Sequence, residues 1–227
     1  MSDKKHDVEH SEVIVAKAKD FWTRNSNIIL GIGSVLLLLV GGYYIYKNYF
    51  QKPKEVKAAD AVFKAEQYYR IDSFKLALNG DGRDLGLVKV IDKYSGTDAA
   101  NVACFLAGVC YGKLDDNDNA IKYLKKFSTD AKQIQQRAYK LLGDAYGDKG
   151  QSGEALDYYK KAAHYFETDK EGSAEALFAA AYLSQTVLKN NNQAIELYKE
   201  VKDKFPGTSS AAEADKYLAL MGTYNVN

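Results

Sequence analysis

Side chains able to bind a metal ion or attack a substrate are scarce in this sequence. It holds three histidines, His6, His10 and His164, and none lies among cysteines or acidic residues at the spacing of metal ligands. It also lacks a phosphate-cradling Gly-rich loop and the sharp Gly-x-Ser-x-Gly turn of a hydrolase nucleophile. We therefore expect no enzyme activity, no catalytic or metal-binding residue, no cofactor and no small-molecule substrate, and we interpret His164 as a structural or surface residue.

Two acidic runs have the residue types that bind calcium, because carboxylate and amide oxygens are its usual ligands. In the run Asn-Gly-Asp-Gly at 79–82, the alternation of oxygen ligands fails at Arg83. The run Asp-Asp-Asn-Asp-Asn at 115–119 lacks the turn glycine and has Lys126 where the loop needs a glutamate. We interpret both runs as turns.

The two cysteines, Cys104 and Cys110, fall in one predicted helix. Their side chains diverge at this spacing, so a disulfide between them is poorly placed. We interpret both as small core residues, and they leave the redox compartment undecided.

The charge balance argues against nucleic acid as a partner. Lysine and arginine total 31 against 30 aspartates and glutamates, the N-terminal tail is balanced, and the rest of the chain has an excess of only one basic residue. A nucleic-acid-binding surface would need a basic stripe, and none is present in the sequence.

One apolar segment, residues 25–46, contains no charged residue and divides the chain into two parts. As a helix rising about 1.5 Å per residue it reaches roughly 33 Å, enough to cross a hydrocarbon core of about 30 Å. We predict a single-pass transmembrane helix in the lipid bilayer. The alternative is a cleavable signal peptide, which has a shorter apolar core followed by small residues, whereas bulky tyrosines follow Gly41 and Gly42 here.

The segments on either side of the span are polar. In the tail, residues 1–24, a short apolar stripe of Ile14, Ala18, Phe21 and Trp22 indicates either an amphipathic helix on a membrane or partner, or an early start of the membrane helix that frays into a disordered tail. We favour the second. Residues 47–57 form a charged connector, and one long helix is predicted over 55–78.

The remaining chain, residues 58–222, is predicted to be all-α and repetitive, followed by a short C-terminal tail at 223–227. The chain has only two prolines and is rich in good helix formers. The segment 90–97 recurs as 201–208, each copy before an alanine-rich helix. We expect an α-solenoid of four helical hairpins with turns near Gly80, Asp116, Gly150 and Asn191, closed by a capping helix over 209–221.

One helix pair carries a spaced signature of small and large residues, namely Tyr139, Leu142, Gly143, Tyr146, Ala155, Tyr159 and Ala162. Small residues at Gly143 and Ala155 would let two antiparallel helices approach closely. This pattern resembles the tetratricopeptide repeat family, with Glu167 in place of the terminal proline. In the last pair Tyr182 stands where the family has glycine, which leaves the close crossing of that pair open.

The resemblance implies an α-solenoid whose first helices line a protein-binding groove. Carried over by position, the groove residues are Val102, Phe105 and Val109 in one pair, and Arg137, Lys140 and Asp144 in the next. Such a groove would be apolar at one end and polar at the other. An apolar partner segment would gain about 25 cal/mol per Å² of surface removed from water. Alternatively, Phe105 and Val109 are covered by the helix near Tyr68.

Membrane orientation does not follow from charge, because lysine and arginine flank the span on both sides. The layout of tail, span, connector and degenerate repeats is similar to the bacterial YfgM-like ancillary subunits of the Sec translocon, as found in the Bacteroidetes. That resemblance implies a bacterial inner-membrane protein with a cytoplasmic N-terminus and a periplasmic repeat domain.

The same resemblance implies a chaperone-like role in protein transport, with translocon subunits, a membrane-bound chaperone or secretory clients as partners. Alternatives are a scaffold for cell division or envelope assembly, and a cytosol-facing receptor that docks a chaperone. The alternative from a different functional class is an undetected hydrolase. It would require a cluster of polar residues in the groove.

Overall fold

The computed structural model describes the backbone of residues 3–223 and the side chains of residues 14–223. The side chains of His6 and His10 and the tail residues 224–227 lie outside this part. The described chain is all-α, as predicted, and contains no strand. It divides into two compact units, Met1–Pro53 and Lys54–Asn227, with the division inside the connector predicted at 47–57.

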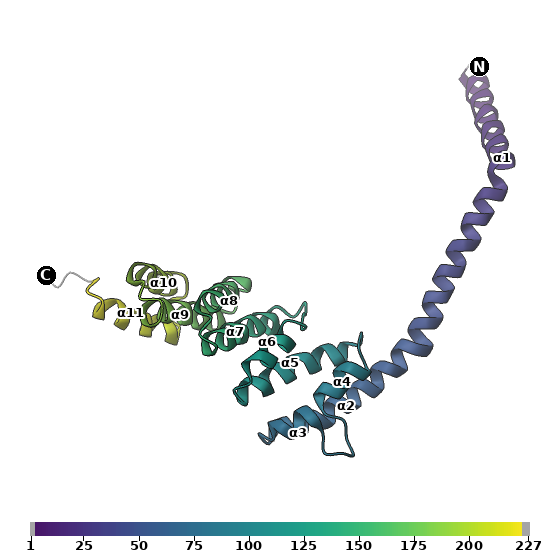
Figure 1. The fold of residues 1–227 in the computed structure, drawn as a ribbon. Helices are drawn as coiled ribbons and strands as arrows, with labels where there is room; N and C mark the ends of the chain where they lie inside the picture. Colours follow the sequence, from purple (N-terminus) through teal and green to yellow (C-terminus); the bar gives the residue numbers. More distant parts are fainter. Residues whose placement is uncertain (1–2, 224–227) are drawn as a thin grey trace. The chain divides into compact units, whose positions relative to one another are not determined.

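The first unit is one long helix (Figure 1). Helix α1 (Asp3–Ile45) continues into a π-helical segment, η1 (Tyr46–Gln51), and then into α2 (Lys52–Arg70). The backbone is therefore helical from Asp3 to the end of the predicted tail, and no break occurs at the predicted tail–span boundary. The π-helical turns precede Pro53, whose missing N–H interrupts the normal ladder of helical hydrogen bonds.

This helix is long and apolar enough to cross a membrane. Its apolar side chains are exposed, Leu37 and Leu38 most of all. The polar side chains near them bond to their own helix, because Ser34 Oγ donates to the Leu30 carbonyl (2.8 Å) and Asn25 Nδ2 to the Phe21 carbonyl (2.9 Å). A lipid-facing helix requires this internal pairing, since hydrocarbon offers no hydrogen bonds.

The prediction of one long helix over 55–78 is wrong in its second half. Helix α2 ends at Arg70, and a separate short helix, α3 (Phe74–Asn79), follows. Asp72 lies between them in the left-handed conformation, with φ of 57°, which ends a helix and is tolerated by aspartate. The predicted turn near Gly80 then connects α3 to α4 (Leu87–Lys93).

Three regular hairpins follow and stack side by side along the second unit (Figure 1). Their helices are α5 (Asp98–Lys113) with α6 (Asn117–Leu124), α7 (Lys132–Asp148) with α8 (Ser152–Tyr165), and α9 (Lys170–Thr186) with α10 (Asn191–Lys204). Helix α11 (Ser209–Leu220) packs on α9 and α10. The predicted hairpin turns near Asp116, Gly150 and Asn191 and the final helix are confirmed.

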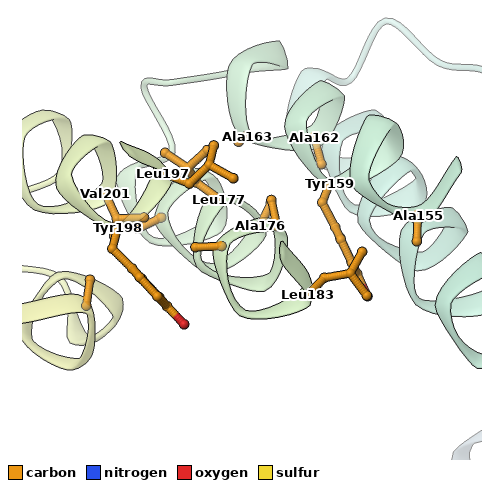
Figure 2. Packing of buried hydrophobic residues seen from close by; sticks show 14 of the residues in the cluster. Ala155, Tyr159, Ala162, Ala163, Ala176, Leu177, Leu183, Leu197, Tyr198 and Val201 are labelled. Atoms are coloured by element: carbon orange, nitrogen blue, oxygen red, sulfur yellow. The ribbon is translucent and has the colours of Figure 1, made fainter. Parts of the chain in front are cut away.

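In the α5–α6 and α7–α8 hairpins a glycine meets a large residue at the helix crossing. A Cβ added to Gly143 would lie 2.5 Å from the Tyr159 ring, and one added to Gly108 would lie 2.5 Å from Leu124 Cγ. Ala155 faces Gly147 instead, because a Cβ added to Gly147 would lie 3.8 Å from the Cβ of Ala155. The close approach predicted for Gly143 is therefore present, but its partner is Tyr159. Figure 2 shows Tyr159 and Tyr198, each reaching into the packed interior from the second helix of its hairpin.

The helices of the last hairpin, α9 and α10, pack together although Tyr182 stands where the family has glycine. Tyr198 is fully buried, whereas the Tyr182 ring is turned outward and 45% of the residue is exposed. The Tyr182 ring lies edge-on to Tyr217 of α11 at 5.9 Å and stacks on Phe178 at 6.5 Å. Outward rotation of this side chain therefore resolves the conflict that the sequence left open.

The cysteines and the two acidic runs have structural roles. Cys104 and Cys110 are free and buried in α5, as predicted, and burial raises the pKa of the Cys110 thiol to about 12. Asp116 caps α6 by accepting from the Asn119 N–H. Asp81 accepts from the N–H groups of Arg83 and Asp84 and from the Tyr68 hydroxyl.

One carboxylate of helix α2 binds the N-terminus of the first regular hairpin. Glu55 of α2 accepts hydrogen bonds from the backbone N–H groups of Asp98 (2.8 Å) and Ala99 (2.7 Å) at the start of α5. These N–H groups have no partner inside their own helix, and the helix dipole favours a negative charge there. The contact therefore fixes α2 on α5.

The crossing at Gly143 predicts opposite effects of two glycine-to-alanine substitutions. Gly143→Ala is expected to destabilise the repeat domain by about 1–3 kcal/mol, because the new methyl group overlaps the Tyr159 ring. Gly153→Ala, at an open position in the first turn of α8, is expected to stabilise by up to about 1 kcal/mol through helix propensity. Urea unfolding of the full chain in detergent micelles measures both. Equal stability of Gly143→Ala and the wild type would contradict this packing.

The Asp81 turn predicts a pH dependence. Hydrogen bonds from the Asp84 N–H, the Tyr68 hydroxyl and the Arg83 N–H lower the pKa of Asp81 from 3.8 to about 2. Because the folded-state pKa lies below the unfolded value, the stabilisation is present above pH of about 4 and is lost as the pH falls towards about 2. Carboxyl-carbon NMR should give a midpoint near the lowered value, and a midpoint at the ordinary value would contradict the turn geometry. The stability deficit of Asp81→Asn should shrink over the same acid range.

Candidate functional site

The residues predicted to line a groove lie on α5 and α7, the first helices of two adjacent hairpins. The structure places four of the six in two hollows. One, the α5–α7 hollow, has a volume of about 160 Å³ and includes Val109 and Asp144 in its lining. The other, the α7–α9 hollow, has a volume of about 400 Å³ and includes Arg137 and Lys140.

The two hollows are joined by the side chain of Lys140. Its ammonium group lies 3.1 Å from Asp144 Oδ2 and 3.1 Å from Glu175 Oε1, so it links the lining of one hollow to that of the other. Burial by itself lowers the pKa of Lys140, but the Asp144 and Glu175 carboxylates outweigh it and the pKa is raised overall. Lys140 therefore remains a cation at neutral pH.

The hairpin crossing supports this charge pair. The Tyr159 hydroxyl donates to Asp144 Oδ1 at 2.9 Å, while the same Tyr159 ring fills the space left by Gly143. Burial and the negative charge of Asp144 raise the pKa of Tyr159, so the hydroxyl stays protonated and remains a donor. The Asp144 carboxylate is thus held in position by a residue of the second helix.

The other two predicted residues, Phe105 and Val102, line neither hollow. The Phe105 ring is half-buried and packs on Phe127 with the ring centroids 5.1 Å apart. Val102 is 46% exposed on α5. The apolar end predicted for the groove is therefore smaller than the sequence indicated, because one of its rings packs within its own hairpin.

The α7–α9 hollow also contains residues that the sequence argument missed. Ile134 and Gln136 of α7 lie in its wall, together with Asp169, Gly172 and Glu175 from the start of the next hairpin. The family positions used for the prediction cover only three places on each first helix. The sequence shows two adjacent amides, Gln135 and Gln136, but only the structure shows that both are buried, so no sequence signal marked this wall.

His164 lies on the surface, away from these hollows. Its ring nitrogens face Glu167 (3.0 Å) and Glu200 (3.7 Å), and Lys204 lies within 3.2 Å of both carboxylates. Hydrogen bonds from His164 and Lys204 lower the pKa of Glu167. The histidine thus belongs to a group of polar and charged side chains that connects the end of α8 and the residues after it to α10, as expected for a surface residue.

Comparison with known protein families matches the tetratricopeptide repeat at residues 102–128, 136–164 and 175–208. These segments correspond to the hairpins α5–α6, α7–α8 and α9–α10. No curated protein matches the chain. Between residues 102 and 208 the chain therefore contains tetratricopeptide repeats, helical units that typically form non-enzymatic scaffolds for protein–protein interaction.

Proposed function

We propose that this chain is a membrane-anchored, non-enzymatic adaptor that binds an extended segment of another protein along α5, α7 and α9. The observation that carries the proposal is the succession of two hollows between these first helices, joined by Lys140. A segment crossing successive helices would meet apolar surface at Val109 and Leu141 and charged groups at Lys140, Arg137 and Glu175. Apolar contact would give affinity, and the charges would select the partner and its direction.

The membrane helix has a definite consequence for such binding. A tethered groove meets partners in the same membrane at an effective concentration set by the tether rather than by the bulk solution. Weak contacts in small hollows then suffice for a useful occupancy. The absence of charged residues from the apolar segment 25–46 favours a tether over a path for ions or substrates.

We propose protein export as the process, at the Sec translocon of a bacterial inner membrane, with the repeats in the periplasm. The support is the layout of tail, single span and degenerate repeats, which is similar to that of YfgM-like subunits. Translocon subunits, a membrane-bound chaperone or secretory chains would be the partners. A scaffold for cell division or envelope assembly, and a cytosol-facing chaperone receptor, are the competing proposals, and partner identity distinguishes them.

Site-specific crosslinking tests the binding surface and the process together. A photoreactive amino acid in place of Ile134, which is 43% exposed in the α7–α9 hollow, is expected to capture a protein in cell membranes. The matched control is Val187, another exposed aliphatic residue, which lies beyond the far end of α9, roughly 18 Å along the helix from Glu175. Equal capture from both positions would contradict a groove in this place.

The identity of the captured protein distinguishes protein export from the competing scaffold proposal. Translocon subunits or nascent secretory chains support export, whereas capture of division proteins alone would replace export with the scaffold proposal.

A reporter fused after Asn227 tests the orientation. An alkaline phosphatase that folds only in an oxidising compartment is expected to be active, because the repeats are proposed to be periplasmic. A fluorescent protein that matures in the cytoplasm serves as the opposite control at the same position. Fluorescence without phosphatase activity would reverse the proposed orientation and favour the cytosol-facing receptor.

A further inference from the structure

Helix α2 has an apolar face that the repeat domain does not cover. The residues of α2 that pack into the core of the domain are Ala58, Ala61, Val62 and Ala65. Three other apolar residues of the same helix, Val56, Ala59 and Phe63, are exposed to solvent. The exposed fraction is 70% for Val56 and 56% for Phe63. We call these three residues the α2 stripe, and the packing of the domain does not account for their apolar character.

The α2 stripe has the spacing of a seam between two helices. Ala59 follows Val56 by three residues and Phe63 follows Ala59 by four, which is the alternation found at the contact positions of a coiled coil. At about 3.6 residues per turn the three side chains lie within an arc of roughly 60°. Single apolar residues are common on protein surfaces, but residues aligned at this spacing indicate a second helix packed along them.

The charges along this face are balanced. Residues 59–70 contain two acidic and two basic side chains. Lys64 Nζ lies 3.6 Å from Asp60 Oδ2. Arg70 Nη2 lies 2.9 Å from Glu66 Oε1. A strongly acidic or basic partner finds no complementary excess of charge here, whereas an identical helix has the same balance. In a parallel pair, Arg70 of one copy would lie beside Glu66 of the other, so each carboxylate keeps a cation near it.

The proposed membrane anchor sets the direction in which two copies can meet. Two copies inserted in one membrane with the same orientation hold equivalent residues of α2 at the same height above it. A symmetric, parallel contact between the two α2 helices is therefore the arrangement open to them. Confinement to one membrane also raises the effective concentration of each copy for the other, so a short seam suffices.

We propose that the α2 stripe is the contact surface between two copies of this chain, with Val56, Ala59 and Phe63 facing their counterparts across a two-fold axis. Ala59 allows the two backbones to approach, and the larger side chains supply apolar area. A contact of this self-complementary kind closes at two copies. The inference goes beyond the proposed function, because it rests on the membrane anchor and not on the groove. A dimer carries two grooves and would hold a partner with two binding segments more tightly than one groove could.

Cysteine crosslinking of the full chain in cell membranes tests the seam. The wild type provides the baseline, since Cys104 and Cys110 are buried. Oxidation with copper phenanthroline is expected to link two copies by a disulfide in each of three single variants, Val56→Cys, Ala59→Cys and Phe63→Cys.

The matched controls are Lys57→Cys and Lys64→Cys. Each lies one residue after a member of the α2 stripe and is also exposed, but it points about 100° away around the helix. Crosslinking at these positions should be roughly tenfold weaker, because a disulfide requires Cβ atoms within about 4.5 Å of each other. Equal crosslinking at the control positions and the α2 stripe, or none at the α2 stripe, would reject the dimer and leave the proposed adaptor function standing.

Charge exchange at Phe63 distinguishes a second copy from any other occupant. In the Ala59→Cys chain, Phe63→Glu places two carboxylates opposite each other and should lower crosslinking about tenfold. Phe63→Lys should have the same effect through two ammonium groups. Co-expression of the two variants with different tags should restore the crosslink between them, and this recovery also shows that both variants fold.

The remaining outcomes each overturn a defined claim. Loss of crosslinking in both charge variants without recovery on co-expression would assign the α2 stripe to a lipid or to another protein and reject the second copy. Release of the chain from membranes by alkaline carbonate would contradict the anchor itself, on which both the dimer and the proposed membrane-anchored function rest.

Discussion

The close crossing of two helices within a hairpin is the constraint on which this repeat domain depends. At Gly143 and Gly108 the backbone of the first helix lies so near its partner that a single Cβ would overlap Tyr159 or Leu124. The large residue supplies buried apolar area, and the glycine supplies the room for it. Two helices held this tightly act as one unit, and neighbouring units then stack through their remaining apolar faces.

The same crossing positions charged side chains that line the α5–α7 and α7–α9 hollows. Tyr159 packs its ring over Gly143 and uses its hydroxyl to hold Asp144, which pairs with Lys140. Lys140 in turn pairs with Glu175 of the next hairpin. A packing residue of a second helix thus sets the position of charges that line the surface between first helices. This coupling explains how a repeat with mainly structural signature residues can still present a defined polar surface.

The sequence was sufficient for the fold class and for most hairpin turns, because glycine, asparagine and aspartate mark the turns and the helix-forming residues between them are unambiguous. It was not sufficient at Asp72, where a non-glycine residue takes a left-handed conformation and ends α2 early. Nor did it anticipate the packing of Phe105 on Phe127, because the family positions describe a repeat in general and not the loop after α6. Gln136 was missed for a similar reason, since its side chain is held by a hydrogen bond to Ser173 of the next repeat.

The degenerate first part of the repeat domain has a physical role that follows from its contacts. Helix α2 contains no glycine like those at the crossings of the α5–α6 and α7–α8 hairpins, yet Glu55 fixes it on the N-terminus of α5 with two short hydrogen bonds. A carboxylate at a helix N-terminus is favoured by charge as well as by hydrogen bonding, and here it satisfies donors that no intrahelical partner reaches. Ala58, Ala61, Val62 and Ala65 of α2 are buried in the same cluster as the residues of α5. The helix that follows Pro53 is therefore part of the repeat domain's core, and it supports the N-terminus of α5 directly.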